Sequence, residues 1–191
     1  MRYVLFLSVG LLMLAAPPAS AQKMLIYMDL EQRDHLKAYG VAFQALEQGF
    51  TIEWLLNYRG GSFVLDATED RVRSCRLKGV SYAVISGAEL ARIFAEIEAN
   101  NMDRLMLEKA PKIVVYTSPD QRPWDDAVTM ALKYAEVPYK TIWDKEVLKG
   151  DLNKYDWLHL HHEDFTGQYS KFYSYHRMPW YQQRQATAEA L

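Results

Sequence analysis

The sequence has a single cysteine, Cys75, and this scarcity excludes an internal disulfide or a zinc site built from several thiolates. It also has little net charge, since 22 Lys and Arg residues against 24 Asp and Glu residues leave −2. A chain so close to neutral has no strongly basic character, so we expect no nucleic-acid partner. Cys75 lies in a charged stretch, residues 70–78, that reads as a helix, and we expect its thiol to be structural.

Only one long hydrophobic run is present, and it lies at the start, from Leu5 to Ala16. The positive Met1-Arg2 precedes it, and Pro17-Pro18 and the small residues Ala19-Ser20-Ala21 follow it. This order is typical of a secretory signal peptide, residues 1–21, and the run is too short to cross about 30 Å of hydrocarbon. We therefore expect an exported protein, periplasmic or extracellular, whose mature part begins near Gln22 and has no membrane span.

The sequence as a whole has the composition of a packed globular protein, 50% hydrophobic and 24% charged. Short apolar runs alternate with amphipathic stretches, which predicts strands alternating with helices. Because most runs are apolar throughout, we expect a mainly parallel open sheet covered on both faces, as in a three-layer α/β sandwich of flavodoxin-like or class I glutamine amidotransferase-like type. The expected strands are residues 23–28, 51–57, 81–86, 112–118, 139–143 and 155–161. The expected helices are residues 34–48, 70–78, 88–100 and 125–136.

The helix expected at residues 34–48 has a single apolar stripe, which we expect to face the core. Its members are Leu36, Tyr39, Gly40, Phe43 and Leu46.

Aromatic residues are concentrated near the end of the sequence, where seven fall between Phe165 and Tyr181. The chain then stops at residues 185–191, within what reads as a helix. We expect residues 22–191 to form a single α/β domain, the amino-terminal part of a longer protein that covers these aromatics. As an alternative, the aromatic segment contacts a protein or glycan partner.

The first candidate site lies where two predicted strands end, because ligands of open α/β sheets bind beyond the carboxyl ends of strands. Asp29 follows the first strand, and Arg59, Gly60, Gly61 and Ser62 follow the second. Two glycines allow backbone N–H groups to turn toward an anion, and Arg59 can bind a carboxylate or phosphate with two hydrogen bonds. These five residues predict a site for a small polar or anionic ligand; an ordinary Gly-Gly turn is the alternative. No GxGxxG or GxxxxGK[ST] motif accompanies them, so a nucleotide cofactor is not expected.

The second candidate site is a dense cluster at the end of the last predicted strand. Alternation places His159 and His161 on one face, about 7 Å apart along the strand and within reach of one Zn or Mn ion. His161 or His162, oriented by Glu163 or Asp164, are the best candidates for general acid–base catalysis. The alternative is that the histidines bind backbone carbonyls and only stabilise the strand.

Four segments of the sequence carry a family resemblance. They are Asp34–Gly40, Trp54–Phe63, Pro123–Ala127 and Tyr155–Tyr169. Together they resemble exported Bacteroidota-type proteins commonly called asparagine synthetase B, over essentially residues 23–185. The resemblance implies a class I glutamine amidotransferase-like α/β protein, of which this chain is an amino-terminal portion.

The chemistry in that family name requires residues that the sequence lacks. Glutamine-dependent asparagine synthesis needs a free amino-terminal cysteine and an SGGxDS pyrophosphate loop, and Gly60-Gly61-Ser62 is not followed by that aspartate and serine. We therefore expect an exported amidotransferase-like domain that binds a small polar or anionic ligand, with any catalysis being amide or ester hydrolysis. The alternative is a non-catalytic periplasmic module that binds a glycan or a protein.

Overall fold

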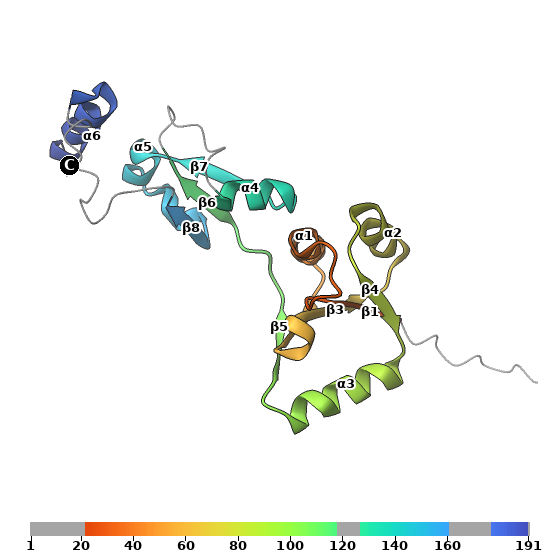
Figure 1. The fold of residues 1–191 in the computed structure, drawn as a ribbon. Coiled ribbons are helices and arrows are strands. Elements are labelled where there is room, and N and C mark those ends of the chain that lie inside the picture. The colour runs from red at the N-terminus through yellow and green to blue at the C-terminus, as the bar shows by residue number, and fades with distance from the viewer. Residues whose placement is uncertain (1–21, 118–126, 161–176, 191) are drawn as a thin grey trace, which may run out of the picture.

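The computed structural model describes residues 22–117, 127–160 and 177–190, and it arranges their strands in two sheets (Figure 1). The first sheet is antiparallel throughout, with the strand order β4-β1-β3-β2-β5. The second is parallel, with the order β7-β6-β8. The strands of the first sheet are β1 (Lys23–Ile26), β2 (Ile52–Leu56), β3 (Ser62–Asp66), β4 (Tyr82–Ile85) and β5 (Asp103–Leu107). Those of the second are β6 (Ile113–Tyr116), β7 (Tyr139–Ile142) and β8 (Trp157–Leu160).

The first sheet is built from a βαββαβ unit that is followed by one more helix and strand. Helices α1 (His35–Glu47) and α2 (Glu69–Lys78) cover one face, and α3 (Gly87–Ala99) crosses the other before the chain returns as β5 (Figure 1). Between β2 and β3 lies a short 3₁₀ helix, η1 (Tyr58–Gly60). The unit from β1 to β4 has the split βαβ arrangement of ferredoxin-like folds, in which β3 lies between β1 and β2.

The two faces of this sheet carry separate apolar cores because side chains alternate along each strand. Met24 and Ile26 belong to the core under α1 and α2. Leu25 belongs to the core under α3, together with Ile93 and Ile97 of that helix. Helices on both faces therefore explain why Met24, Leu25 and Ile26 of β1 are consecutive apolar residues.

The predicted flavodoxin-like or class I glutamine amidotransferase-like sandwich with one mainly parallel sheet is wrong. Each predicted strand and helix is present, but two unpredicted strands, β3 and β5, pair beside β2 and make the first sheet antiparallel. A continuous apolar run indicates that both faces of a strand are buried, but it does not indicate the direction of the neighbouring strands. Here α3 covers the second face of an antiparallel sheet. Among the strands of the described residues, parallel pairing is confined to β6, β7 and β8.

The second sheet is connected by helices α4 (Ala127–Tyr134) and α5 (Asp144–Leu148) and by the 3₁₀ helix η3 (Asp151–Lys154). The last described element is α6 (Pro179–Glu189), in the segment where the sequence reads as a helix. Within the described part of the chain, no helix combines the length and the apolar character that a membrane crossing requires.

Candidate functional site

The structure brings Asp29 and Arg59 together, as predicted for residues that follow β1 and β2. The Arg59 Nε atom lies 2.6 Å from Oδ2 of Asp29, and its Nη2 atom lies 2.7 Å from Oε2 of Glu31. The guanidinium group also lies over the ring of Tyr27, 3.8 Å from the ring centroid. The hydrogen bond from Arg59 holds the pKa of Asp29 below its ordinary value. The charge of Arg59 is thus matched by carboxylates of the chain itself.

The other three residues of the predicted site, Gly60, Gly61 and Ser62, make their contacts with the backbone of the turn itself and of the neighbouring strand end. Gly60 has a φ of +78°, and a Cβ there would lie 2.2 Å from the Met28 carbonyl oxygen. The Gly61 N–H donates to Tyr58 O at 3.0 Å, and the buried Ser62 hydroxyl donates to Arg59 O at 3.1 Å. The five residues are adjacent, but these contacts build a closed turn, and their binding of an anionic ligand stays a prediction.

The predicted catalytic and metal cluster lies mostly outside the described residues. His159 is half-buried on β8, whereas His161, His162, Glu163 and Asp164 belong to the segment that the structure does not describe. In the ranges that it describes, no three His, Cys, Asp or Glu side chains are grouped so that they could hold a metal ion. The roles of these five residues, including a Zn or Mn site at His159 and His161, therefore stay predictions.

Cys75 is a structural thiol. It is fully buried on α2, with its Sγ atom 3.9 Å from the Met24 Sδ atom. Burial raises the pKa of the Cys75 thiol to about 11, so the reactive thiolate is scarce near neutral pH.

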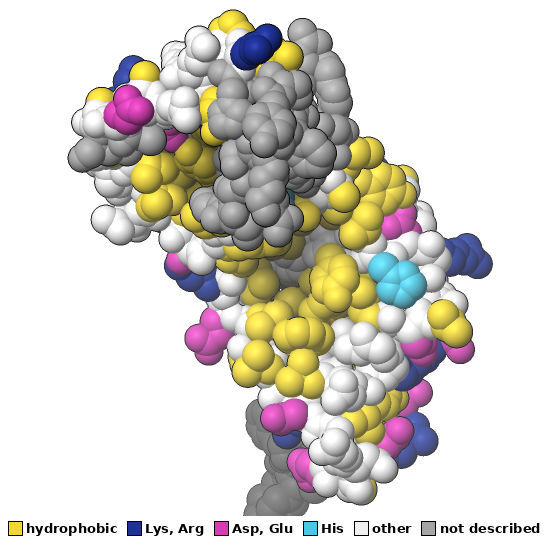
Figure 2. All heavy atoms as spheres, turned by 60° about the vertical axis from the view of Figure 1, so that its left-hand side comes forward, with side chains coloured by type: hydrophobic (Ala, Val, Ile, Leu, Met, Phe, Trp, Pro, Cys, Tyr) yellow, Lys and Arg dark blue, Asp and Glu magenta, His cyan; other side chains and the backbone are white. Residues whose placement is uncertain are grey.

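An apolar groove of about 530 Å³ lies where the two sheets meet. Helix α1 and strands β2 and β3 supply part of its wall, and α4 and β8 supply another part. Hydrophobic side chains gather across the middle of the face shown in Figure 2. The lining residues are Leu36, Tyr39, Ala42, Phe43, Leu46, Ile52, Trp54, Phe63, Leu107, Pro111, Ile113, Ala127, Val128, Ala131, Leu132, Ala135, Val137 and Trp157.

Aromatic rings make up the wall of the groove on the side of the first sheet. Trp54 stacks on Phe63 with 6.3 Å between ring centroids, and Tyr39 meets Phe63 edge-on at 5.6 Å. Leu36 and Tyr39 of α1 remain 41% and 47% exposed, although both belong to the stripe that was expected to face the core. The groove therefore presents large apolar side chains that the described part of the fold does not cover.

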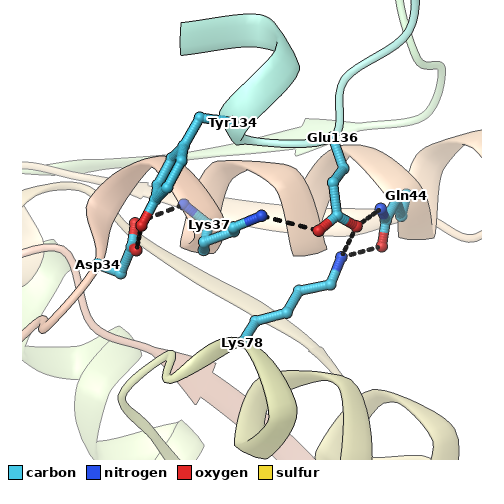
Figure 3. Close-up of polar contacts among 6 residues, drawn as sticks. All are labelled: Asp34, Lys37, Gln44, Lys78, Tyr134 and Glu136. Atoms are coloured by element: carbon cyan, nitrogen blue, oxygen red, sulfur yellow. Dashed lines mark hydrogen bonds and ion pairs between the residues drawn. The ribbon is translucent and has the colours of Figure 1, made fainter.

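A polar network holds α4 against α1 beside this groove (Figure 3). Glu136 follows α4 with a φ of 60°, and its carboxylate accepts from Lys37 of α1 and Lys78 of α2, each at 2.7 Å. Lys78 also donates to Gln44 at 3.0 Å. The hydrogen bonds from Lys37 and Lys78 lower the pKa of Glu136 to about 2. Three helices are thus tied together at one carboxylate.

Gly40 allows the two helices to approach even more closely. A Cβ at this position of α1 would lie 1.9 Å from the carbonyl oxygen of Ala135, which follows α4. No side chain larger than hydrogen fits there without a movement of the backbone. Gly40 and Glu136 therefore fix the spacing between the helices that line the groove.

A second hollow, of about 560 Å³, adjoins the groove and has a different character. Four lysines line it, together with Glu47, Tyr139 and Tyr155. Phe43, Leu46, Pro111 and Ile113 line both hollows, so the two are neighbours. We call the second hollow the lysine pocket; its lysines are Lys109, Lys112, Lys140 and Lys154.

Sequence reasoning did not find the groove or the lysine pocket, because their residues come from segments far apart in the chain. The available signal was the apolar stripe on residues 34–48, two of whose large side chains, Leu36 and Tyr39, are exposed in the structure. Comparison with family models, with curated proteins and with solved structures finds no match to this chain. The resemblance to exported proteins called asparagine synthetase B therefore stays a prediction.

Proposed function

We propose that this chain is an exported, non-catalytic binding module that holds a small apolar ligand in the groove between its two sheets. The observation that carries the proposal is the groove itself. Its volume of about 530 Å³ falls within the roughly 300–1,000 Å³ of small-molecule sites, and its lining is hydrophobic and aromatic, as such sites are. A buried apolar ligand would cover side chains, such as Leu36 and Tyr39, that are now exposed to water.

The catalytic alternative has less support among the described residues. Arg59 is paired with Asp29 and Glu31, and Cys75 is buried. Amidotransferase-like hydrolysis depends on His161 and its neighbours, for which no contact is described. Glutamine or ester hydrolysis by the chain, abolished in His161→Ala, would favour that alternative.

The proposal is tested with an uncharged probe, N-phenyl-1-naphthylamine, which fluoresces when it leaves water. The full chain is expected to bind it saturably. Leu36→Gln adds a polar group to the groove and Ala131→Trp fills it, so each should weaken probe binding about tenfold or more. Leu77→Gln, at a residue of α2 that is 77% exposed and outside the groove, is the matched control and should bind as the wild type does.

Circular dichroism melts show whether each variant is folded before its affinity is compared. A folded wild type without saturable binding would contradict the proposal. Equal affinities in the wild type and in both folded groove variants would contradict it as well.

A further inference from the structure

The lysine pocket carries more positive charge than its own surroundings neutralise. Lys109 pairs with Asp156 at 3.1 Å, and Lys154 pairs with Asp151 at 2.5 Å. Lys112 and Lys140 have no ion-pair partner among residues 22–117, 127–160 and 177–190.

Among the described residues that line the pocket, Glu47 is the only acidic one. Asp156 also interacts with Lys112, whose backbone N–H and charge both help to lower the pKa of that carboxyl. The four lysines of the pocket are therefore balanced by three carboxylates, those of Glu47, Asp151 and Asp156, and the remaining positive charge can attract an anion.

The change in character between the two hollows is abrupt. No charged side chain is among the described residues that line the groove, whereas four lysines line the pocket next to it. The two hollows share a boundary. It is formed by Phe43 and Leu46 of α1 and, from a later part of the chain, by Pro111 and Ile113. A ligand that extends past this boundary would have an apolar body on one side and a charged group on the other.

We infer that the ligand is a single-chain amphiphile with an anionic head, a long-chain carboxylate, whose chain lies in the groove and whose head lies between Lys112 and Lys140. This inference rests on the proposed function, since it names the ligand class of the same groove. The ammonium groups supply charge-assisted hydrogen bonds to the carboxylate. The groove volume, in the lower half of the range for small-molecule sites, suits one chain of such a ligand.

The test compares decanoate with decanol, which have the same chain length and differ at the head. Each displaces bound N-phenyl-1-naphthylamine from the full chain at low ionic strength. Decanoate is expected to displace the probe at a concentration at least about tenfold lower than decanol. In the double variant Lys112→Gln/Lys140→Gln this preference should vanish, while the affinities for decanol and for the probe stay unchanged.

The matched control is Lys133→Gln/Lys149→Gln, which removes the same charge from two exposed lysines outside both hollows. It should keep the decanoate preference, because long-range attraction to the whole chain is equally reduced in both double variants.

Each other outcome overturns a different claim. Equal displacement by decanoate and decanol in the wild type would overturn the anionic head and leave the apolar site standing. A decanoate preference that survives in Lys112→Gln/Lys140→Gln would place the head elsewhere and overturn the inference. Chain that sediments with phosphatidylglycerol vesicles but releases no probe to decanoate would identify a membrane surface as the partner. Absence of probe binding would overturn the proposed function and the inference together.

Discussion

At the scale of single residues, the turn at Gly60 shows how a glycine can be fixed by the backbone of a neighbouring strand end. Gly60 and Gly79 both have positive φ, +78° and +70°, but only at Gly60 would a Cβ meet other atoms. We expect Gly60→Ala to lower the free energy of unfolding by about 2–4 kcal/mol, from conformational strain and overpacking combined. Gly79→Ala introduces only the strain of a left-handed backbone conformation, so it should lower the free energy of unfolding by about 1 kcal/mol.

Urea denaturation of the two variants measures this difference. If both variants lose the same free energy of unfolding, the Met28 carbonyl oxygen does not lie 2.2 Å from the position of the new Cβ at residue 60.

The same turn shows which part of the candidate site the sequence predicts. That Asp29 and Arg59 meet follows from two strands that end at one edge, because β1 and β2 run in the same direction. Their direct ion pair, and the second pair with Glu31, depend on the backbone path of the turn. Asn57 and Arg59 adopt left-handed conformations there, at φ of 63° and 46°. Asparagine favours this conformation but arginine does not, so the sequence does not predict the backbone path at Arg59.

At the scale of elements, Glu136 joins α1, α2 and the turn after α4 through two lysines. Its folded-state pKa, about 2, lies below the ordinary 4.5, so its stabilisation is complete above about pH 5 and is lost as the pH falls toward 2. Because 48% of the side chain is exposed, solvent screening limits the contribution to about 1 kcal/mol. We expect Glu136→Gln to lower the free energy of unfolding by that amount at pH 7 and by clearly less at pH 2, where half of the Glu136 carboxyl groups are protonated.

Urea denaturation at several pH values tests this dependence. Glu108→Gln is the matched control, since Glu108 is exposed and makes no ion pair with the described residues. A loss in Glu136→Gln that is the same at pH 7 and at pH 2 would exclude the two ion pairs as its cause.

The sequence predicts where most strands lie better than it predicts which strands pair with one another. Periodicity identifies β1, β2, β4, β6, β7 and β8, because an apolar run needs burial whichever neighbour it pairs with. β3 follows directly on the Gly60-Gly61 turn and reads as part of a loop, although four of its five residues are buried. β5 is an edge strand whose residues are mostly exposed, and its apolar run, Leu105 to Leu107, is only three residues long, which is too short to identify a strand. These two strands decide the antiparallel topology.

At the scale of the whole molecule, the groove arises from how the two sheets are joined, and no single segment contains it. Leu36 and Tyr39 on α1 belong to one apolar stripe with Leu46, which is buried. Local periodicity predicts that all three face a core, but Leu46 is buried in the core of the first sheet, whereas Leu36 and Tyr39 line the groove and stay exposed. A site built between distant segments is therefore the part of this molecule that sequence reasoning finds last.

Gly40 is the residue at which the joining of the two sheets can be tested. In an open helix, Gly→Ala raises the free energy of unfolding by about 1 kcal/mol. Here the new Cβ would lie 1.9 Å from the Ala135 carbonyl oxygen, so α1 and α4 must separate. We expect Gly40→Ala to lower the free energy of unfolding by about 1–3 kcal/mol. It should also weaken probe binding, because both helices line the groove.

Urea denaturation and titration with N-phenyl-1-naphthylamine measure the two effects on the same variant. A combined loss would connect the spacing of the helices to the binding site, as expected if the sheets hold the groove open between them. A Gly40→Ala chain that is more stable than the wild type and binds the probe equally well would show that α1 and α4 are not in close contact. The groove would then not depend on that contact, and the spacing set by Gly40 would have no role in binding.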